Sequence, residues 1–582
     1  MKNDGERKVT GIGIAPGVAI GPAFVIEQSG VPVPEYEIPV ADVAAETKRL
    51  HGAIAKVQKH LGQLRARAAA LPAGAEDMVL LLDAYKAMLS GSRLVRGAED
   101  IIARQRLNAE AAVQKQIAVL RAGFAAMGDE YLAARGDDVA DVGTRLIRSL
   151  QEQHYNPFAA APEGCVILAE EITPADAALM VPGRIAGFAT MLGGAEGHAA
   201  IMARALGLPA VSGAAALTHG VRSGEMVIID GRAGFAIIRP DAATVQHYRH
   251  ELARKKQEDK KLKSLRSVPA VTQDGTPVGL HANLELPRDV DAALEAGAIG
   301  IGLLRTEFMF MNRPDLPGED EQYAVLRKLV ERLDGRVLTV RTLDVGGEKL
   351  ATALGDAVGE SVNPALGLRA IRLGLKQPKL LDTQLAAILR AGQHGPVRIL
   401  IPMVSSVAQM AQVRARLLQV ERRLHRRGVK VKQPPVGAMI EIPSAALVAD
   451  ALAKVCDFFA IGSNDLTQYT LAIDRGDEHV ADLYDPFHPA VLRLIQFTAA
   501  AGWRANIPVS ICGEIAGDRR AAPLLLGLGV RDLSMSPLRL PAVKQEITQM
   551  TLAQALGFAE SVMAKTDEAD IRAMMAQGPA RK

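Results

Sequence analysis

Two segments far apart in the sequence carry residue types that together could move a phosphoryl group. His198 follows a Gly-Gly pair and precedes a stretch with helical spacing of apolar residues. Asn464 and Asp465 lie in the run Gly-Ser-Asn-Asp-Leu-Thr-Gln at 462–468, and Arg475 follows it. Neutral imidazole is a good nucleophile that forms a labile P–N bond, and the second group of side chains can hold a phosphate and a divalent metal. The pairing predicts a phosphoryl relay through a histidine.

Eight short apolar runs after residue 267, separated by helical patterns, predict a (β/α)₈ barrel. The runs are 278–283, 299–304, 336–341, 398–403, 436–440, 458–462, 508–512 and 532–536. Catalytic groups of such barrels lie at the carboxyl ends of the strands. Polar residues fall repeatedly at this end of the predicted strands: Arg305, Arg341, Glu441, Asn464, Asp465 and Cys512. We therefore expect one shared site, rather than separate buried salt bridges.

The residue types at the predicted strand ends specify a small, multiply charged anion as the ligand. Arg305, Arg341 and Arg475 offer planar forks that match phosphate or carboxylate oxygens. Glu441 and Asp465 offer hard oxygen ligands, which suit Mg²⁺ held jointly with substrate oxygens. Phosphoenolpyruvate, which carries both a carboxylate and a phosphate, is the candidate substrate. The arginines and the metal would draw charge from the phosphoryl group as it leaves.

Cys512 and His198 each have a structural interpretation beside the catalytic one. Loss of the phosphoryl group leaves an enolate, and Cys512, the only strand-end thiol of the predicted barrel, could protonate it. A lone cysteine on a strand is, however, more often a small core residue. His198 near a helix start could accept a phosphate held by backbone N–H groups, or could make only a structural hydrogen bond. The residue types alone leave both alternatives open.

The chain before the predicted barrel divides into α/β and helical parts, which predicts a multidomain α/β protein. Residues 1–30 and 146–240 show short strand-like and helical patterns and form the expected α/β domain. Residues 31–145 are rich in helix-forming residues with apolar positions at helical spacing, so we expect an inserted helical subdomain. The charged segment 241–266 predicts a solvated helical linker, and 267–582 the barrel domain.

Length, charge and cysteine content limit the classes of protein to which the chain can belong. A chain of 582 residues should hold several domains. The net charge of +3 gives no electrostatic case for binding nucleic acid or membrane. The three cysteines, Cys165, Cys456 and Cys512, lie far apart and fit a reducing cytoplasm. The charged N-terminus is unlike a signal peptide, and no apolar run approaches the ~20 residues of a membrane helix. We expect a cytoplasmic protein.

Together these residues resemble enzyme I of the phosphoenolpyruvate-dependent sugar phosphotransferase system. The resemblance runs from residues 11–22 to 533–536 and includes the His198 segment, the 462–468 segment and two helical segments at 129–132 and 141–146. It implies a swivelling α/β phosphohistidine domain whose helical insert docks an HPr-type phosphocarrier. It also implies a barrel that binds phosphoenolpyruvate and forms a homodimer. The implied activity is transfer of the phosphoryl group to the protein's own histidine and then to a histidine of the carrier, with release of pyruvate.

The resemblance further implies a role for each candidate residue. His198 is the phosphorylated residue, through its Nε2, and Cys512 is the proton donor to the enolate. Thr173 matches a residue packed against the active histidine. The metal ligands for Mg²⁺ are Glu441 and Asp465. The residues that match the substrate-binding positions are Arg305, Arg341, Lys349, Arg369, Asn464, Asp465 and Arg475.

The sequence departs from the family pattern before the histidine, at Tyr85 and, with a mild expected effect, at Ala460, where serine is commoner. Glu196 and Gly197 precede the histidine where the family has Thr-Ser. A carboxylate that faced the phosphate would disfavour phospho-His198 by like-charge repulsion, whereas one that faced solvent or paired with Arg204 would change little. Tyr85 stands where the family often has a histidine that contacts the carrier.

Other functions stay as alternatives. A degenerate, non-catalytic regulator that binds the phosphocarrier is kept open by Glu196. A pyruvate phosphate dikinase or a phosphoenolpyruvate synthase would need a nucleotide-binding domain before the histidine domain, and the helical stretch found there has no Gly-rich phosphate loop. We expect a sugar-type or stand-alone form rather than a nitrogen-type one with an N-terminal sensory domain, although the carrier's identity is not encoded in these motifs.

Overall fold

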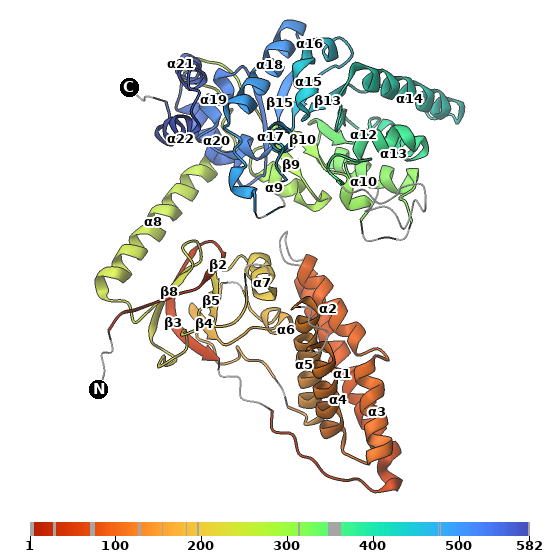
Figure 1. The fold of residues 1–582 in the computed structure, drawn as a ribbon, viewed down its shortest axis with the longest axis vertical. Coiled ribbons are helices and arrows are strands. Elements are labelled where there is room, and N and C mark those ends of the chain that lie inside the picture. The colour runs from red at the N-terminus through yellow and green to blue at the C-terminus, as the bar shows by residue number, and fades with distance from the viewer. Residues whose placement is uncertain are drawn as a thin grey trace. The chain divides into compact units, whose positions relative to one another are not determined.

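The chain folds into two compact units, residues 1–256 and 257–582. The computed structural model shown in Figure 1 describes residues 5–26, 31–69, 76–125, 130–153, 155–181, 183–194, 197–311, 313, 315–346, 363–474, 477 and 479–579. Among these residues, no helix is long and apolar enough to cross a membrane.

The first unit is built on an eight-stranded sheet with the order β1-β8-β7-β3-β4-β5-β6-β2. The pairs β3–β4, β4–β5 and β5–β6 are parallel. The pairs β1–β8, β8–β7, β7–β3 and β6–β2 are antiparallel. The central strand β4 is buried along its whole length, which explains its continuous apolar sequence. The strands are β1 Arg7–Thr10, β2 Ile12–Ala15, β3 Val18–Ile26, β4 Cys165–Ala169, β5 Ile185–Thr190, β6 Ala210–Ser212, β7 Met226–Asp230 and β8 Phe235–Ile238.

A bundle of five helices lies between β3 and β4 in the sequence, as the helical periodicity predicts (Figure 1). The helices are α1 Val43–Ala69, α2 Glu76–Met88, α3 Arg93–Gln105, α4 Ala109–Ala125 and α5 Glu130–Leu150. The buried positions of α1 recur every three to four residues, so one apolar face packs against α2 and α5. Helix α2 also contacts the two short helices of the α/β part, α6 Pro174–Ala177 and α7 His198–Leu206. This packing places α7 beside the bundle.

The second unit is a closed barrel of eight strands, each parallel to both neighbours. Every predicted apolar run overlaps one strand, so the predicted (β/α)₈ barrel is confirmed. The strands are β9 Gly279–Leu284, β10 Ile301–Leu304, β11 Leu338–Arg341, β12 Val397–Ile401, β13 Val436–Ile440, β14 Phe459–Ile461, β15 Val509–Ile511 and β16 Asp532–Met535.

Helices separate the barrel strands, and a long charged helix, α8 Ala242–Ser264, precedes them. Two further helices, α21 Leu552–Met563 and α22 Glu568–Gln577, follow the last barrel helix. The helices among the strands are α9 Val290–Glu295, α10 Glu319–Arg332, α12 Ala370–Lys376, α13 Pro378–Ala391, α14 Val407–Arg426, α15 Pro443–Leu447, α16 Ala449–Leu452, α17 Ser463–Leu471, α18 Pro489–Ala505, α19 Ala522–Gly527 and α20 Leu540–Thr548.

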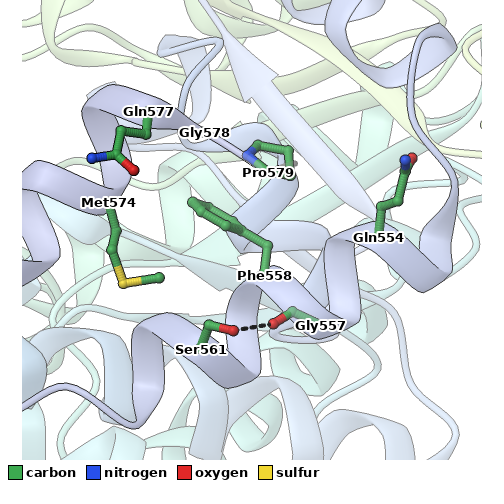
Figure 2. A pocket seen from close by; sticks show the side chains of 8 residues that line it. All are labelled: Gln554, Gly557, Phe558, Ser561, Met574, Gln577, Gly578 and Pro579. Atoms are coloured by element: carbon green, nitrogen blue, oxygen red, sulfur yellow. Dashed lines mark hydrogen bonds between the residues drawn. The ribbon is translucent and has the colours of Figure 1, made fainter. Parts of the chain in front are cut away.

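Helices α21 and α22 enclose a cavity of about 330 Å³, shown in Figure 2. Figure 2 shows Phe558 and Met574 among the side chains that line it. The Ser561 hydroxyl donates a hydrogen bond of 2.8 Å to the Gly557 carbonyl. The eight lining residues carry no charge: Gln554, Gly557, Phe558, Ser561, Met574, Gln577, Gly578 and Pro579. This cavity therefore offers a phosphorylated anion no cationic side chain among its lining residues, unlike the strand ends of the barrel.

Candidate active site

The carboxyl ends of four barrel strands bring four of the predicted site residues into one cluster. Arg305 follows β10, Arg341 ends β11, Glu441 follows β13 and Cys512 follows β15. These four side chains are close enough for Glu441, Arg341 and Arg305 to shift the pKa of the Cys512 thiol. Residues separated by more than a hundred positions in the sequence thus share one electrostatic environment, as the predicted barrel requires.

Arg341 is the most enclosed cation of the cluster. Its guanidinium contacts the Glu307 carboxylate at 3.1 Å and the Asp344 carboxylate at 3.0 Å. Burial alone would lower the pKa of Arg341, but these two carboxylates raise it above its ordinary value, so the side chain stays charged. Within the described part of the chain, the Nε of Arg341 and the Oε2 of Glu307 are buried without a hydrogen-bond partner. A buried unpaired donor is costly unless a ligand uses it.

Two more arginines contribute to the cluster. Arg369 precedes α12 and donates to the Asp344 carboxylate at 2.8 Å and to the Tyr469 hydroxyl at 3.4 Å. Its guanidinium also lies 4.0 Å from the Asp465 carboxylate. Arg305 is more exposed, at 40% of its side chain, and pairs with the carboxylate of Glu285, which follows β9. Carboxylates therefore hold both arginines at the strand ends.

Three carboxylates of the cluster, those of Asp344, Glu441 and Asp465, lie with their oxygens within 4.8 Å of one another. Burial and the charges of the other two raise the pKa of Glu441 well above its ordinary range. A divalent cation among these oxygens would offset both effects. Carboxylate oxygens are also the ligands that Mg²⁺-type cations prefer. The residues present therefore fit a metal.

Asp344 is a site residue that the sequence reasoning did not assign. It lies three residues after the end of β11, next to the predicted Arg341. Its carboxylate pairs with Arg341 and Arg369. One of its oxygens also lies within 4.8 Å of oxygens of Glu441 and Asp465, close enough for the three to share a metal ion. Its place at a strand end was a usable signal, but its double role depends on contacts with residues distant in the sequence.

The side chain of Glu441 is fixed by the backbone N–H of a residue in an unusual conformation. Its Oε1 accepts a hydrogen bond of 2.6 Å from the N–H of Met403, whose φ is 56°. A non-glycine residue in this left-handed region costs about 1–3 kcal/mol and is typical of functional sites. Ala370, which follows Arg369, has a φ of 51° as well. Costly backbone conformations thus occur next to two residues of the cluster, Glu441 and Arg369.

Asn464 lies in the first turn of α17 and has a fixed orientation. Its Nδ2 donates to the Glu514 carboxylate at 3.2 Å, and its Oδ1 accepts from the Glu514 N–H at 2.9 Å. An amide nitrogen has two hydrogens, so one N–H of Asn464 can still donate to a ligand. Glu514 was not predicted from the sequence, although it follows Cys512 by only two residues.

Cys512 is 4% exposed, and its Sγ lies 3.5 Å from the Ile461 carbonyl oxygen. Burial, together with the charge of Glu441, raises the pKa of the Cys512 thiol to about 12, although Arg341 and Arg305 oppose the shift. The thiol therefore keeps its proton near neutral pH. A protonated thiol beside charged anion-binding groups is what a proton donor requires.

Two predicted substrate-binding residues, Lys349 and Arg475, lie outside the described residues. Glu196, whose orientation decides how it affects His198, also lies outside them. Their predicted roles are therefore left as predictions.

The second candidate centre is His198 in the first unit. His198 is the first residue of α7, Gly197 is its N-cap, and the preceding turn uses Gly193 with a φ of 108°. The His198 side chain is 33% exposed, and its Nδ1 lies 3.7 Å from the Oδ1 of Asp138 on α5. A ring that is partly exposed and beside a carboxylate fits a nucleophile.

Two other predicted residues near α7 have clear structural partners. Thr173 caps α6, and its hydroxyl accepts hydrogen bonds from the Asp176 N–H and from Arg145 of α5. Tyr85 of α2 is only 1% exposed and donates a hydrogen bond of 3.3 Å to Asp138. Tyr85 stands where the family often has a carrier-contacting histidine, and its buried side chain presents almost no surface here.

Comparison with known proteins agrees with this architecture. Three PEP-utilising enzyme families match in succession: the N-terminal part at residues 10–135, the mobile domain at 161–234 and the PEP-binding domain at 259–552. The fold and the site thus define a PEP-utilising enzyme. More narrowly, the chain belongs to the phosphoenolpyruvate-protein phosphotransferase family, the enzymes I, which confirms the resemblance.

The similarity to two phosphoenolpyruvate-protein phosphotransferases extends over nearly the whole chain. The phosphoenolpyruvate-protein phosphotransferase of Cupriavidus necator is 42% identical over 550 residues, which are 92% of this chain and 93% of the relative. The protein of that name from Bacillus subtilis is 37% identical and covers 98% of this chain and 99% of the relative. A solution NMR structure of an enzyme I (nEIt) is 31% identical, covers 43% of this chain and 99% of that one, and has a TM-score of 0.37.

Proposed function

We propose that the protein transfers the phosphoryl group of phosphoenolpyruvate to its own His198 and then to a histidine of an HPr-type phosphocarrier, releasing pyruvate. This is the first step of the sugar phosphotransferase system. The observation that carries the proposal is the strand-end cluster of the barrel, in which arginines, three carboxylates and a protonated thiol meet. Membership of the phosphoenolpyruvate-protein phosphotransferase family supports it.

Phosphoenolpyruvate binds through the cationic side of the cluster. Arg341 is charged and has an unused buried N–H, while Arg305 and Arg369 can exchange a carboxylate partner for a substrate oxygen. Lys349, Arg475, Asp465 and the free N–H of Asn464 complete the proposed substrate-binding set. We assign Mg²⁺ to Glu441 and Asp465, with Asp344 as a further oxygen ligand. When bound, this ion would neutralise charge on the phosphoryl oxygens as they leave.

The His198 ring and the Cys512 thiol carry out the two bond changes. The lone pair of His198 Nε2 forms the N–P bond while the bond from phosphorus to the enol oxygen breaks, and its electrons leave with the enolate. Cys512 then gives its proton to the methylene carbon of the enolate, which yields pyruvate. The resulting thiolate regains a proton from solvent. The phosphoryl group leaves His198 when the carrier's histidine attacks phosphorus.

The remaining assignments extend this proposal. We propose that residues 1–30 and 146–240 form the phosphohistidine domain and that 31–145 form the carrier-binding insert. We also propose that 241–266 link this half to a dimer-forming barrel domain at 267–582. A cytoplasmic location fits these partners. The α8 helix at Ala242–Ser264 supports a helical link.

The test is incubation with Mg²⁺ and ³²P-labelled phosphoenolpyruvate, with wild type beside His198→Ala and His219→Ala. His219 is an exposed histidine of the same unit and serves as the matched control. We expect acid-labile, base-stable label on wild type and His219→Ala, and none on His198→Ala. If folded wild type took up no label but bound the phosphocarrier, the non-catalytic regulator would replace this proposal.

A further inference from the structure

A buried carboxylate faces His198 from the helical bundle. Asp138 of α5 is 3% exposed, and its Oδ1 lies 3.7 Å from the Nδ1 of His198. This nitrogen is the one opposite the proposed phosphoryl acceptor, Nε2. The two residues are sixty positions apart and meet only because the bundle packs against α7 through α2.

Two side chains hold Asp138 in this position. Tyr85 of α2 donates its hydroxyl to Oδ1 at 3.3 Å, and Arg135 donates to Oδ2 at 3.2 Å. Burial and the carboxylates of Asp141 and Asp138 raise the pKa of the Tyr85 phenol far above its ordinary value. The phenol therefore stays protonated and remains a donor. Since Tyr85 is itself buried, the carboxylate cannot easily rotate away from the ring.

A carboxylate beside one ring nitrogen decides which tautomer a neutral imidazole adopts. The nitrogen that faces the carboxylate carries the proton, and the other nitrogen presents its lone pair. Here the proton would stay on Nδ1, which leaves Nε2 as the nucleophile. After the N–P bond forms at Nε2, the ring keeps its Nδ1 proton and becomes a cation, whose charge Asp138 offsets. A small rotation of the ring would shorten the 3.7 Å separation to a hydrogen bond.

We propose that Asp138, held by Tyr85, is a positioning residue that keeps the proton of His198 on Nδ1 and so directs phosphoryl transfer to Nε2. This inference rests on the proposed function, since it names what prepares the acceptor histidine. It assigns a role in the reaction to two residues of the helical bundle.

The matched substitutions are Asp138→Asn and Asp137→Asn. Asp137 is the adjacent carboxylate, but it is 61% exposed and pairs with Arg121 at 2.9 Å. Asparagine keeps the size of the side chain and removes the charge in both variants. Tyr85→Phe removes only the hydroxyl that orients Asp138, and it remains informative if Asp138→Asn proves poorly folded by circular dichroism.

The first readout is the tautomer of His198 in the full-length protein without substrate. Selective ¹⁵N labelling of histidine rings, with His198→Ala for assignment, distinguishes Nδ1–H from Nε2–H at pH 8. We expect the Nδ1–H form in wild type and Asp137→Asn, and a shift toward Nε2–H in Asp138→Asn. A purely structural contact would not move this signal in a folded variant. Wild type protonated on Nε2, or an unchanged tautomer in folded Asp138→Asn, would overturn the inference.

The second readout is the rate of labelling by phosphoenolpyruvate. We expect Asp138→Asn to lower the rate roughly 10–100-fold with little change in the substrate concentration at half-maximal rate. Tyr85→Phe should lower it roughly 2–10-fold, as for loss of one hydrogen bond. A wild-type rate in Asp138→Asn would count against the role. Absence of label on wild type would refute the proposed function instead, while the tautomer measurement, which needs no substrate, would still test Asp138.

Discussion

At the scale of single residues, two arginines of the barrel site, Arg341 and Arg369, share one carboxylate that has a second task. Asp344 contacts Arg341 and Arg369. Its carboxylate is also close enough to those of Glu441 and Asp465 for the three to bind one metal ion. A buried arginine without such partners would be costly. The same carboxylates that stabilise the arginines can therefore exchange with substrate oxygens or bind a cation.

Arg341→Lys keeps the positive charge but should still lower the rate of labelling strongly. Lysine is a point donor and cannot contact Glu307, Asp344 and a substrate oxygen together, as a planar guanidinium can. We expect the labelling efficiency to fall roughly 10²–10³-fold, the range for loss of one well-placed transition-state donor. Arg336→Lys, on an exposed arginine just before β11, is the control and should label normally. Normal labelling of Arg341→Lys would remove this arginine from the substrate-binding set.

Cys512 should be unreactive toward alkylating reagents in the native protein. A thiol with a pKa of about 12 remains almost fully protonated at pH 8, and the thiolate is the reactive form. Because the folded-state pKa lies above the usual value for cysteine, ionisation becomes significant only at strongly alkaline pH. Mass spectrometry after iodoacetamide treatment should show Cys512 unmodified at pH 8 and modified after unfolding. Rapid native alkylation at pH 8 would contradict a raised pKa.

At the scale of elements, the site depends on how closely neighbouring strand ends approach. A Cβ on Gly462 would lie 2.7 Å from the Glu441 Oε2, and one on Gly513 would lie 1.9 Å from the Ser463 Oγ. Ser463 begins α17, which carries Asn464 and Asp465. Glycine at these two turns therefore lets β13, β14 and β15 present their polar residues at short range.

Gly513→Ala should disturb the site through sterics alone. The added methyl would push Ser463, and with it the start of α17, away from β15. Overpacking of this kind costs about 1–3 kcal/mol, so we expect a lower melting temperature and loss of most labelling activity. Gly557→Ala in α21 is the matched control, because nothing lies within 4 Å of its added Cβ. Calorimetry and labelling of both variants test this, and a fully active Gly513→Ala would show that the contact relaxes easily.

At the scale of the whole molecule, the two chemical centres belong to different compact units. The metal-binding and anion-binding cluster lies in residues 257–582, whereas His198 and Asp138 lie in residues 1–256. The proposed reaction therefore consists of two half-reactions with different requirements. The first needs both units, and the second needs the histidine unit and the carrier.

Removal of divalent metal should separate the two half-reactions. With EDTA present, labelling by phosphoenolpyruvate should fall to background, because the three carboxylates no longer hold a cation beside the substrate. Enzyme that is first labelled and then freed of substrate and Mg²⁺ should still pass its label to a phosphocarrier at an unchanged rate. Added Mg²⁺ in excess over EDTA should restore the first step. A second step that also stopped in EDTA would place a metal requirement at the histidine.

Local patterns in the sequence were sufficient to predict the barrel and which polar residues lie at its strand ends. Apolar runs of strand length, each followed by polar residues, located the ends of β10, β11, β13, β14 and β15. The rule that such barrels carry their chemistry at the carboxyl ends then grouped Arg305, Arg341, Glu441 and Cys512 without coordinates. These features are predictable because strand periodicity and residue type are properties of neighbouring residues.

The partners of these residues emerged only from the folded chain. Asp344 as a shared carboxylate, Glu514 beside Asn464, and Asp138 beside His198 all depend on side chains that meet across elements distant in sequence. Burial is also decided by packing between elements: α2 packs against α5 and α7, and Tyr85 of α2 is 1% exposed. Residue type sets which chemistry is available, whereas strand closure and helix packing set the distances and pKa values at which that chemistry operates.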